Sequence, residues 1–87
     1  MRAIELDAHA VEDLAWLIQN DRKLALRALK LIQEAARTPF EGTGKPEPLK
    51  HELAGAWSRR INDEHRLIYK ADATRLRVLA CRYHYDR

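Results

Sequence analysis

The second half of the chain carries side chains that could together transfer protons around a phosphodiester. Glu47 lies between Pro46 and Pro48, which restrict the backbone around it, so its carboxylate is well placed to act as a base. His84 lies near the C-terminus, and an imidazole that titrates near neutral pH can donate or accept a proton. Considered alone, each has a plainer interpretation, as a surface glutamate in a proline-rich turn and as a half-buried histidine of a sheet.

Basic side chains recur along the segments that flank these two groups. A guanidinium binds phosphate oxygens through two parallel hydrogen bonds and can stabilise charge that develops on phosphorus. Arg59 and Arg60 are adjacent in the sequence, so strand alternation turns them to opposite faces and only one can join a common site. The candidate cations are Arg59, Arg60, Arg66, Arg82, Lys45 and Lys50.

The aromatic residues and the remaining histidines have less specific interpretations. Strict alternation turns Tyr83 and Tyr85 away from His84, although Tyr85, at the end of the chain, could still bend into the site. Aromatic rings beside arginines also suit stacking on unpaired bases, whereas Trp57 is expected in the core. No pair of histidine or cysteine residues has the spacing of a zinc site, so no metal or cofactor is expected. The histidines assigned to structural or solvent-facing positions are His9, His51 and His65.

Two helices are predicted before the segment that carries the chemistry. Residues 1–6 alternate loosely and suit a short edge strand, and Asp7 is a good N-cap for the helix that follows. Asn20 and Asp21 should end that helix and cap a second one, which Pro39 ends; helices joined this tightly form an antiparallel hairpin. The apolar positions at helical spacing are Val11, Leu14, Ala15 and Ile18 in the first helix, and Leu24, Ala28, Leu29, Leu31, Ile32 and Ala35 in the second.

The remainder of the chain has the period-two pattern of strands. Residues 40–48 contain two glycines and two prolines and are expected to form a loop. Strands are expected around residues 57–61, 65–70 and 76–85, the last one central because it is apolar on both sides. Helices first and strands later indicate an α+β fold, an antiparallel sheet of four to five strands with the helical hairpin on one face.

Composition limits the class of protein. The 87 residues fit one domain, 1–87, and an apolar fraction of 46% fits a folded chain. A single cysteine, Cys81, excludes an internal disulfide. No apolar run reaches the length of a membrane span, and no signal-peptide core follows Met1, so a cytoplasmic protein is expected. Residues 1–42 hold six basic and seven acidic residues and residues 43–87 hold ten and six, which suits a polyanionic partner or simply a solvated basic face.

The order of the motifs is more specific than any one of them. Thr38-Pro39-Phe40-Glu41-Gly42 precedes Lys-Pro-Glu-Pro-Leu-Lys-His at 45–51, Trp-Ser-Arg-Arg-Ile at 57–61, Glu-His-Arg-Leu-Ile-Tyr at 64–69 and Cys-Arg-Tyr-His-Tyr at 81–85. This order resembles the YoeB/Txe toxins, which belong to the RelE/ParE-like superfamily of bacterial type II toxin–antitoxin systems. The resemblance is close from Thr38 to Tyr85, and residues 1–37 match mainly in pattern.

The resemblance implies a RelE-like fold, similar to microbial ribonucleases, and an endoribonuclease (mRNA interferase) that cuts mRNA at the ribosomal A site. It implies that Glu47 is the base, that Arg66 stabilises the phosphate and that His84 is the general acid. Tyr85 matches a terminal tyrosine that helps to place the scissile group. The basic residues expected to hold RNA are Lys45, Lys50, Arg60 and Arg82.

The resemblance also implies partners. A small antitoxin similar to YefM or Axe should cover the basic face with a disordered acidic segment, and a homodimer is expected through the first helix around Trp16. One departure from the family is that Asp86 and Arg87 follow the tyrosine, which adds an acid beside the site. Two other functions stay open: a non-enzymatic ParE-like toxin that binds DNA gyrase, and a plain RNA-binding module.

Overall fold

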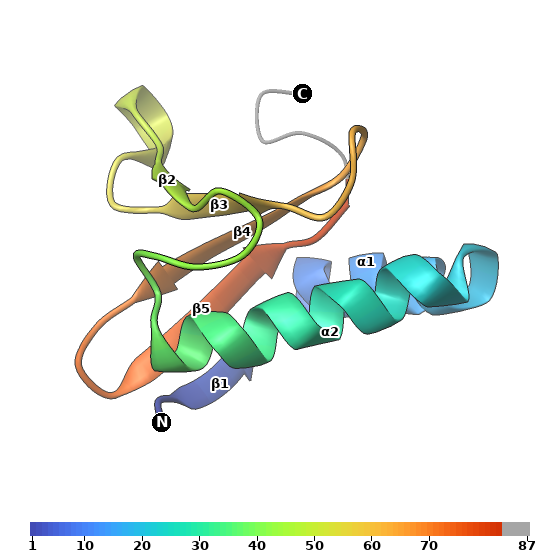
Figure 1. Cartoon of the computed structure of the whole chain (residues 1–87), viewed down its shortest axis with the longest axis horizontal. Helices are drawn as coiled ribbons and strands as arrows, with labels where there is room; N and C mark the ends of the chain where they lie inside the picture. The colour runs from blue at the N-terminus through green and yellow to red at the C-terminus, as the bar shows by residue number, and fades with distance from the viewer. Residues whose placement is uncertain (83–87) are drawn as a thin grey trace.

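Two helices lie side by side on one face of a twisted sheet (Figure 1). The computed structural model describes residues 1–82, and within them the sheet has five strands in the order β1-β5-β4-β3-β2. The α+β class and the helical hairpin predicted from the sequence are both confirmed. The elements are β1 (Ala3–Leu6), α1 (Ala8–Asn20), α2 (Arg22–Arg37), β2 (Glu47–Pro48), the 3-10 turn η1 (His51–Leu53), β3 (Trp57–Arg60), β4 (Arg66–Ala71) and β5 (Arg75–Ala80).

The sheet is mixed, whereas the sequence suggested antiparallel pairing throughout. β2–β3, β3–β4 and β4–β5 are antiparallel, as expected for strands joined by short turns. β1 pairs in parallel with β5, with Ala3 opposite Arg75 and Leu6 opposite Val78. The hairpin of α1 and α2 separates β1 from every other strand in the sequence, so its partner is set by long-range packing. β1 is the edge strand that the sequence predicted.

β5 is central, as predicted, but it ends at Ala80 instead of continuing to Tyr85. The ladder stops because the next amide, that of Cys81, donates a hydrogen bond to Oδ2 of Asp13 in α1 at 3.1 Å. Burial and the Asp13 carboxylate raise the pKa of the Cys81 thiol to about 12, so this cysteine is a protonated core residue and not a nucleophile. Residues 83–85 of the predicted strand lie outside the described residues.

The apolar stripe predicted for α1 has the wrong phase. Ala10, Asp13 and Leu17 are buried, whereas Val11 and Ile18 are 49% and 53% exposed. The sequence pattern favoured the larger apolar side chains, but the helix packs through a small residue, a leucine and a buried carboxylate. In α2 the expected face is mostly confirmed. Its buried residues are Ala25, Ala28, Leu31, Ile32, Ala35 and Ala36, and Leu29 is exposed.

Only one of the two predicted helix caps forms. Asp21 ends α1 and accepts a hydrogen bond from the Leu24 amide at 3.2 Å, as expected for the cap of α2. Asp7 occupies the N-cap position of α1 without a capping hydrogen bond. Its carboxylate instead accepts from the guanidinium of Arg77 in β5, at 2.8 and 3.2 Å. A charged partner on the adjacent strand therefore takes this carboxylate from the helix.

Apolar residues cover both faces of the sheet. The main core fills the space between the helices and one face, where Leu67, Tyr69, Leu76 and Val78 are fully buried. Each such side chain contributes about 1.5–3 kcal/mol by leaving water. A smaller cluster of Leu49, Ala56 and Ile68 lies on the opposite face. Among residues 1–82, no helix has both the length and the apolarity to cross a bilayer.

Candidate functional site

The sheet face turned away from the helices brings an acid and two arginines together. Glu47 pairs with Ser58 between β2 and β3, and Arg60 pairs with Arg66 between β3 and β4. Directly opposed residues project to the same face, and alternate residues of one strand do so as well. Ser58 also pairs with Ile68, which belongs to the smaller apolar cluster. All four side chains therefore share the face opposite the helices.

A pocket of about 140 Å³ lies on this face. Its lining includes four residues that the sequence singled out, the acid Glu47 and the basic residues Lys45, Arg60 and Arg66. Lys50 is exposed and is not part of the lining. His84 and Tyr85, the other two residues assigned to catalysis, lie outside the described residues. The lining is Gly44, Lys45, Glu47, Ser58, Arg60 and Arg66.

The Arg66 guanidinium is held by the turn between β3 and β4. Its Nη1 donates to the carbonyl oxygens of Asn62 at 2.5 Å and His65 at 3.1 Å. Arg60 makes a looser contact, with Nη2 lying 3.9 Å from the fully exposed carboxylate of Asp63. Like charges placed directly opposite each other on a sheet are destabilising. The pairing of Arg60 with Arg66 therefore creates a concentration of positive charge that suits an anionic ligand.

Arg59 faces away from this pocket and is completely buried, as strand alternation predicted for one of the two adjacent arginines. Its guanidinium pairs with the Glu34 carboxylate of α2. Its Nε donates to the Tyr69 hydroxyl at 3.0 Å, and burial raises the pKa of that hydroxyl despite the arginine beside it. The remaining bonds reach carbonyl oxygens of the loop after α2. These acceptors are Thr38 at 2.5 Å, Glu41 at 2.9 Å and Thr43 at 3.2 Å.

Arg82 lies near the helices, apart from the pocket lining. Its guanidinium carbon stacks over the Trp16 ring of α1, 3.7 Å from the ring centroid. The same tryptophan makes an edge contact with His65 at a centroid distance of 6.1 Å. His65 is buried, in agreement with a structural role, and His9 and His51 are exposed. Within residues 1–82, no group of three or more acidic, histidine or cysteine side chains could hold a metal ion.

Sequence reasoning missed Ser58 as a member of the pocket. Its hydroxyl-bearing side chain is nearly buried, at 2% exposure, directly opposite Glu47. The alternation that placed Ser58 and Arg60 on one face could have indicated this, but the pairing of β2 with β3 could not be inferred from a two-residue strand. Trp57 packs against the main core, as predicted, and also contacts Phe40 at 4.8 Å between ring centroids.

Comparison with known proteins assigns the fold to a family of toxins. A family described as the YoeB-like toxin of bacterial type II toxin-antitoxin systems matches residues 6–85. The toxin RelK of Mycobacterium tuberculosis is 52% identical over 85 residues, which cover 98% of this chain and 100% of that protein. This chain therefore belongs to the YoeB-like toxins.

Solved structures agree with this assignment. The YoeB dimer from Staphylococcus aureus matches with a TM-score of 0.88 at 41% identity, covering 97% of this chain and 98% of that one. The YoeB-YefM complex from the same organism matches with a TM-score of 0.86 at 40% identity, covering 98% and 99%. The chain is thus a toxin of a type II toxin–antitoxin system, as its motif order suggested.

Proposed function

We propose that this toxin is an endoribonuclease that cuts mRNA at the ribosomal A site and so stops translation. The observation that carries the proposal is the shared pocket of Glu47, Arg60 and Arg66. A carboxylate beside two guanidiniums is the combination that an attack on a phosphodiester needs. A toxin that acts only by binding a protein such as DNA gyrase does not need a carboxylate and two arginines at one point.

The proposed reaction is an internal attack within the RNA. Glu47 removes the proton of a ribose 2′-hydroxyl, and the oxygen attacks the adjacent phosphorus. Arg66, with Arg60 or Lys50, neutralises the charge on the equatorial oxygens. His84 protonates the departing 5′-oxygen, and Tyr85 helps to place the scissile group. The products are a 2′,3′-cyclic phosphate or a 3′-phosphate and a free 5′-hydroxyl, and the reaction requires no metal.

The geometry of Arg66 supports this role. Its guanidinium is already oriented by the carbonyl oxygens of Asn62 and His65 before any substrate binds. Donors that are fixed in advance need little reorganisation as charge develops, which is the main source of electrostatic catalysis. Lys45 lies in the same pocket and supplies a further cation for the RNA backbone. Arg82 is proposed to contact RNA beyond this pocket.

Analysis of product ends tests the proposal. Purified protein is incubated with ribosomes that are translating a defined mRNA, and the ends of the fragments are determined. We expect cuts within the A-site codon that leave a 2′,3′-cyclic phosphate or 3′-phosphate on one fragment and a 5′-hydroxyl on the other. Intact mRNA with inhibited gyrase would instead support a gyrase-binding toxin. Binding of mRNA without cleavage would support a plain RNA-binding module.

Two protein partners accompany the proposal. The first is a YefM/Axe-like antitoxin that binds the basic half of the chain and blocks the pocket. The second is another copy of this chain, which forms a homodimer through α1, where Val11 and Ile18 are exposed. Residues 1–87 are proposed to act as a single domain in the cytoplasm.

A further inference from the structure

We propose that Glu34, Thr43 and Arg59 are positioning residues for the reaction proposed above. They fix the loop between α2 and β2 against β3, and so set the Glu47 carboxylate opposite Arg60 and Arg66. None of the three lines the catalytic pocket. Their effect on catalysis is transmitted through the backbone of the loop.

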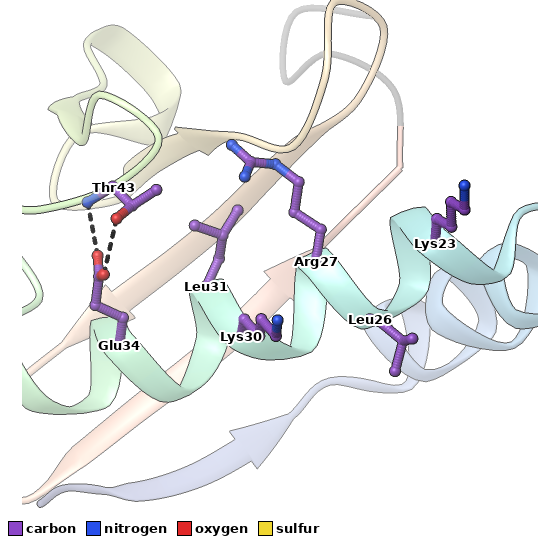
Figure 2. Close-up of a pocket in the computed structure, with 7 residues that line it drawn as sticks. All are labelled: Lys23, Leu26, Arg27, Lys30, Leu31, Glu34 and Thr43. Carbon is purple, nitrogen blue, oxygen red and sulfur yellow. Dashed lines mark hydrogen bonds between the residues drawn. The ribbon is translucent and has the colours of Figure 1, made fainter.

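Glu34 connects helix α2 both to the loop and to β3. Its Oε2 accepts from the Thr43 amide at 2.7 Å and its Oε1 from the Thr43 hydroxyl at 2.9 Å, as Figure 2 shows. Oε2 also pairs with Nη1 of the buried Arg59. One carboxylate on α2 therefore binds both the loop and β3. We call Glu34, Thr43 and Arg59 the loop clamp.

Arg59 holds the loop from the sheet side. Its guanidinium donates to the carbonyl oxygens of Thr38, Glu41 and Thr43, so it holds the loop at three points within its first six residues. An arginine that makes this many bonds while fully buried has a fixed orientation, because every bond that breaks leaves an unsatisfied buried group. The loop is thus fixed over six residues before it enters the pocket.

Two glycines allow the clamp to close. Gly42 has a φ of 122°, and a Cβ at this position would collide with the Glu34 carboxylate. Gly44 has a φ of 86°, and a Cβ there would lie 3.0 Å from the carbonyl oxygen of Arg60. The close approach of Gly44 to Arg60 allows a backbone hydrogen bond, in which the Arg60 amide donates to the Gly44 carbonyl at 2.7 Å. This hydrogen bond joins the clamped loop directly to a pocket arginine.

The backbone between the clamp and the acid is itself constrained. Lys45, a pocket residue, has a φ of 51°, a left-handed conformation that residues with a side chain rarely adopt. Glu47 follows two residues later and is paired with Ser58. The position of its carboxylate therefore depends on the loop at one end and on β3 at the other.

A second contact from α2 holds the other side of the pocket. Arg27 donates from Nε to the Ile61 carbonyl at 2.6 Å and from Nη2 to the Arg60 carbonyl at 3.3 Å. Figure 2 shows Arg27 and Glu34 on the same helix. Both line a hollow of about 460 Å³ beside α2. Helix α2 thus supports both the acidic and the basic side of the pocket, although it lies on the other face of the sheet.

The test uses two substitutions that weaken the clamp. Glu34→Gln removes the charge that pairs with Arg59, and Thr43→Val removes only the hydroxyl bond. Cleavage is measured in a single turnover on ribosomes programmed with mRNA. Binding is measured with the same mRNA carrying a 2′-O-methyl group at the scissile ribose, which cannot be attacked. We expect cleavage to slow by about 10- to 100-fold with unchanged binding of the methylated RNA.

Two variants serve as matched controls. Thr43→Ser keeps both hydrogen bonds and should restore the wild-type rate. Glu5→Gln breaks an exposed ion pair with Arg75, 3.0 Å long and remote from the pocket lining, and should not change the rate. Wild-type cleavage rates in folded Glu34→Gln and Thr43→Val would overturn the proposal. So would a loss of cleavage that is fully explained by weaker RNA binding or by unfolding.

Hydrogen exchange separates this proposal from the nuclease proposal on which it rests. The Arg60 amide, bonded to Gly44, should exchange faster in the clamp variants, while the amide of buried Leu67 should keep its protection. Unchanged exchange at Arg60 would contradict the clamp even if the wild-type protein cuts RNA. If the Arg60 amide exchanges faster in the clamp variants but the wild-type protein does not cut RNA, the nuclease proposal is rejected and the clamp is retained. If Glu34→Gln does not fold, Thr43→Val carries both measurements.

Discussion

Arg60 and Arg66 are directly opposed on adjacent strands, a placement that destabilises a sheet without a ligand. The Glu47 carboxylate on the third strand compensates for only one of these charges. Such local conflicts between stability and placement are typical of functional sites. The pocket therefore has the electrostatic character of a site that awaits an anion.

The first prediction concerns the carboxylate of this pocket. Glu47→Gln removes the general base while keeping the size of the side chain, so single-turnover cleavage should fall about 10²- to 10⁴-fold. The thermal unfolding midpoint should not change, because the side chain is exposed. Glu52→Gln, an exposed glutamate in η1, is the matched control and should cleave normally. A folded Glu47→Gln protein with full activity would contradict the role of the base.

The second prediction concerns acid stability and Glu34. Burial raises the pKa of this carboxyl, but hydrogen bonds from Thr43 and the nearby Arg59 outweigh it, so the pKa lies below its ordinary value of 4.5. A lowered pKa in the native state means that the unfolded chain binds the proton first. The stability that this carboxylate contributes is thus complete above pH 4.5 and is lost as the pH falls through the lower native pKa.

Denaturant unfolding as a function of pH measures this contribution. Between roughly pH 5 and pH 2, the free energy of unfolding should fall less steeply in Glu34→Gln than in the wild type. Asp72, whose pKa is lowered by hydrogen bonds from Thr74 and Arg75, titrates in the same range but is common to both proteins. Identical slopes would show that Glu34 is not held as a carboxylate.

At the scale of elements, the sequence predicted local geometry better than long-range pairing. Alternation along β3 separated buried Arg59 from pocket-facing Arg60, because a strand has a fixed period of two. The phase of α1 was wrong because Asp13 is buried by a contact with Cys81, 68 residues away. No local pattern contains that information. The parallel partner of β1 was missed for the same reason.

For the candidate site too, the sequence indicated the pocket residues but not the distant residues that support them. The motifs indicated Glu47, Arg60 and Arg66, and the structure brings all three into one pocket. The support behind them was not predicted, because Glu34 and Thr43 have ordinary surroundings in the sequence. Only the fold of the loop reveals that they meet Arg59.

The third prediction concerns the contribution of Arg59 to the joining of α2, the loop and β3. Arg59→Met leaves three loop carbonyls without their donor and should lower the free energy of unfolding by about 3–5 kcal/mol. Arg60→Met removes the neighbouring exposed arginine and should change stability by only about 0.5 kcal/mol. Urea unfolding of the two variants measures the difference. Equal effects would contradict the assignment of Arg59 as the structural partner.

At the scale of the whole molecule, the exposed stripe of α1 has a consequence for assembly. Val11 and Ile18 lie on one side of a helix whose other side packs on the sheet. The fourth prediction is that the protein forms the proposed homodimer through this stripe and that Ile18→Glu converts it to a monomer, because a charge in an apolar interface is costly to desolvate. Sedimentation over a range of concentrations measures the state. Leu26→Glu, at an equally exposed position on α2, is the control and should not affect it.

The position of β5 bears on how a cell can make this protein at all. The strand inserts between β1 and β4, so residues 75–80 are what joins β1 to the rest of the sheet. A nascent chain that has reached only β4 has no partner for β1 and cannot close its main core. The main core therefore cannot close until residues 75–80 have joined the sheet, so folding depends on a contact between two parts of the chain that are far apart in the sequence.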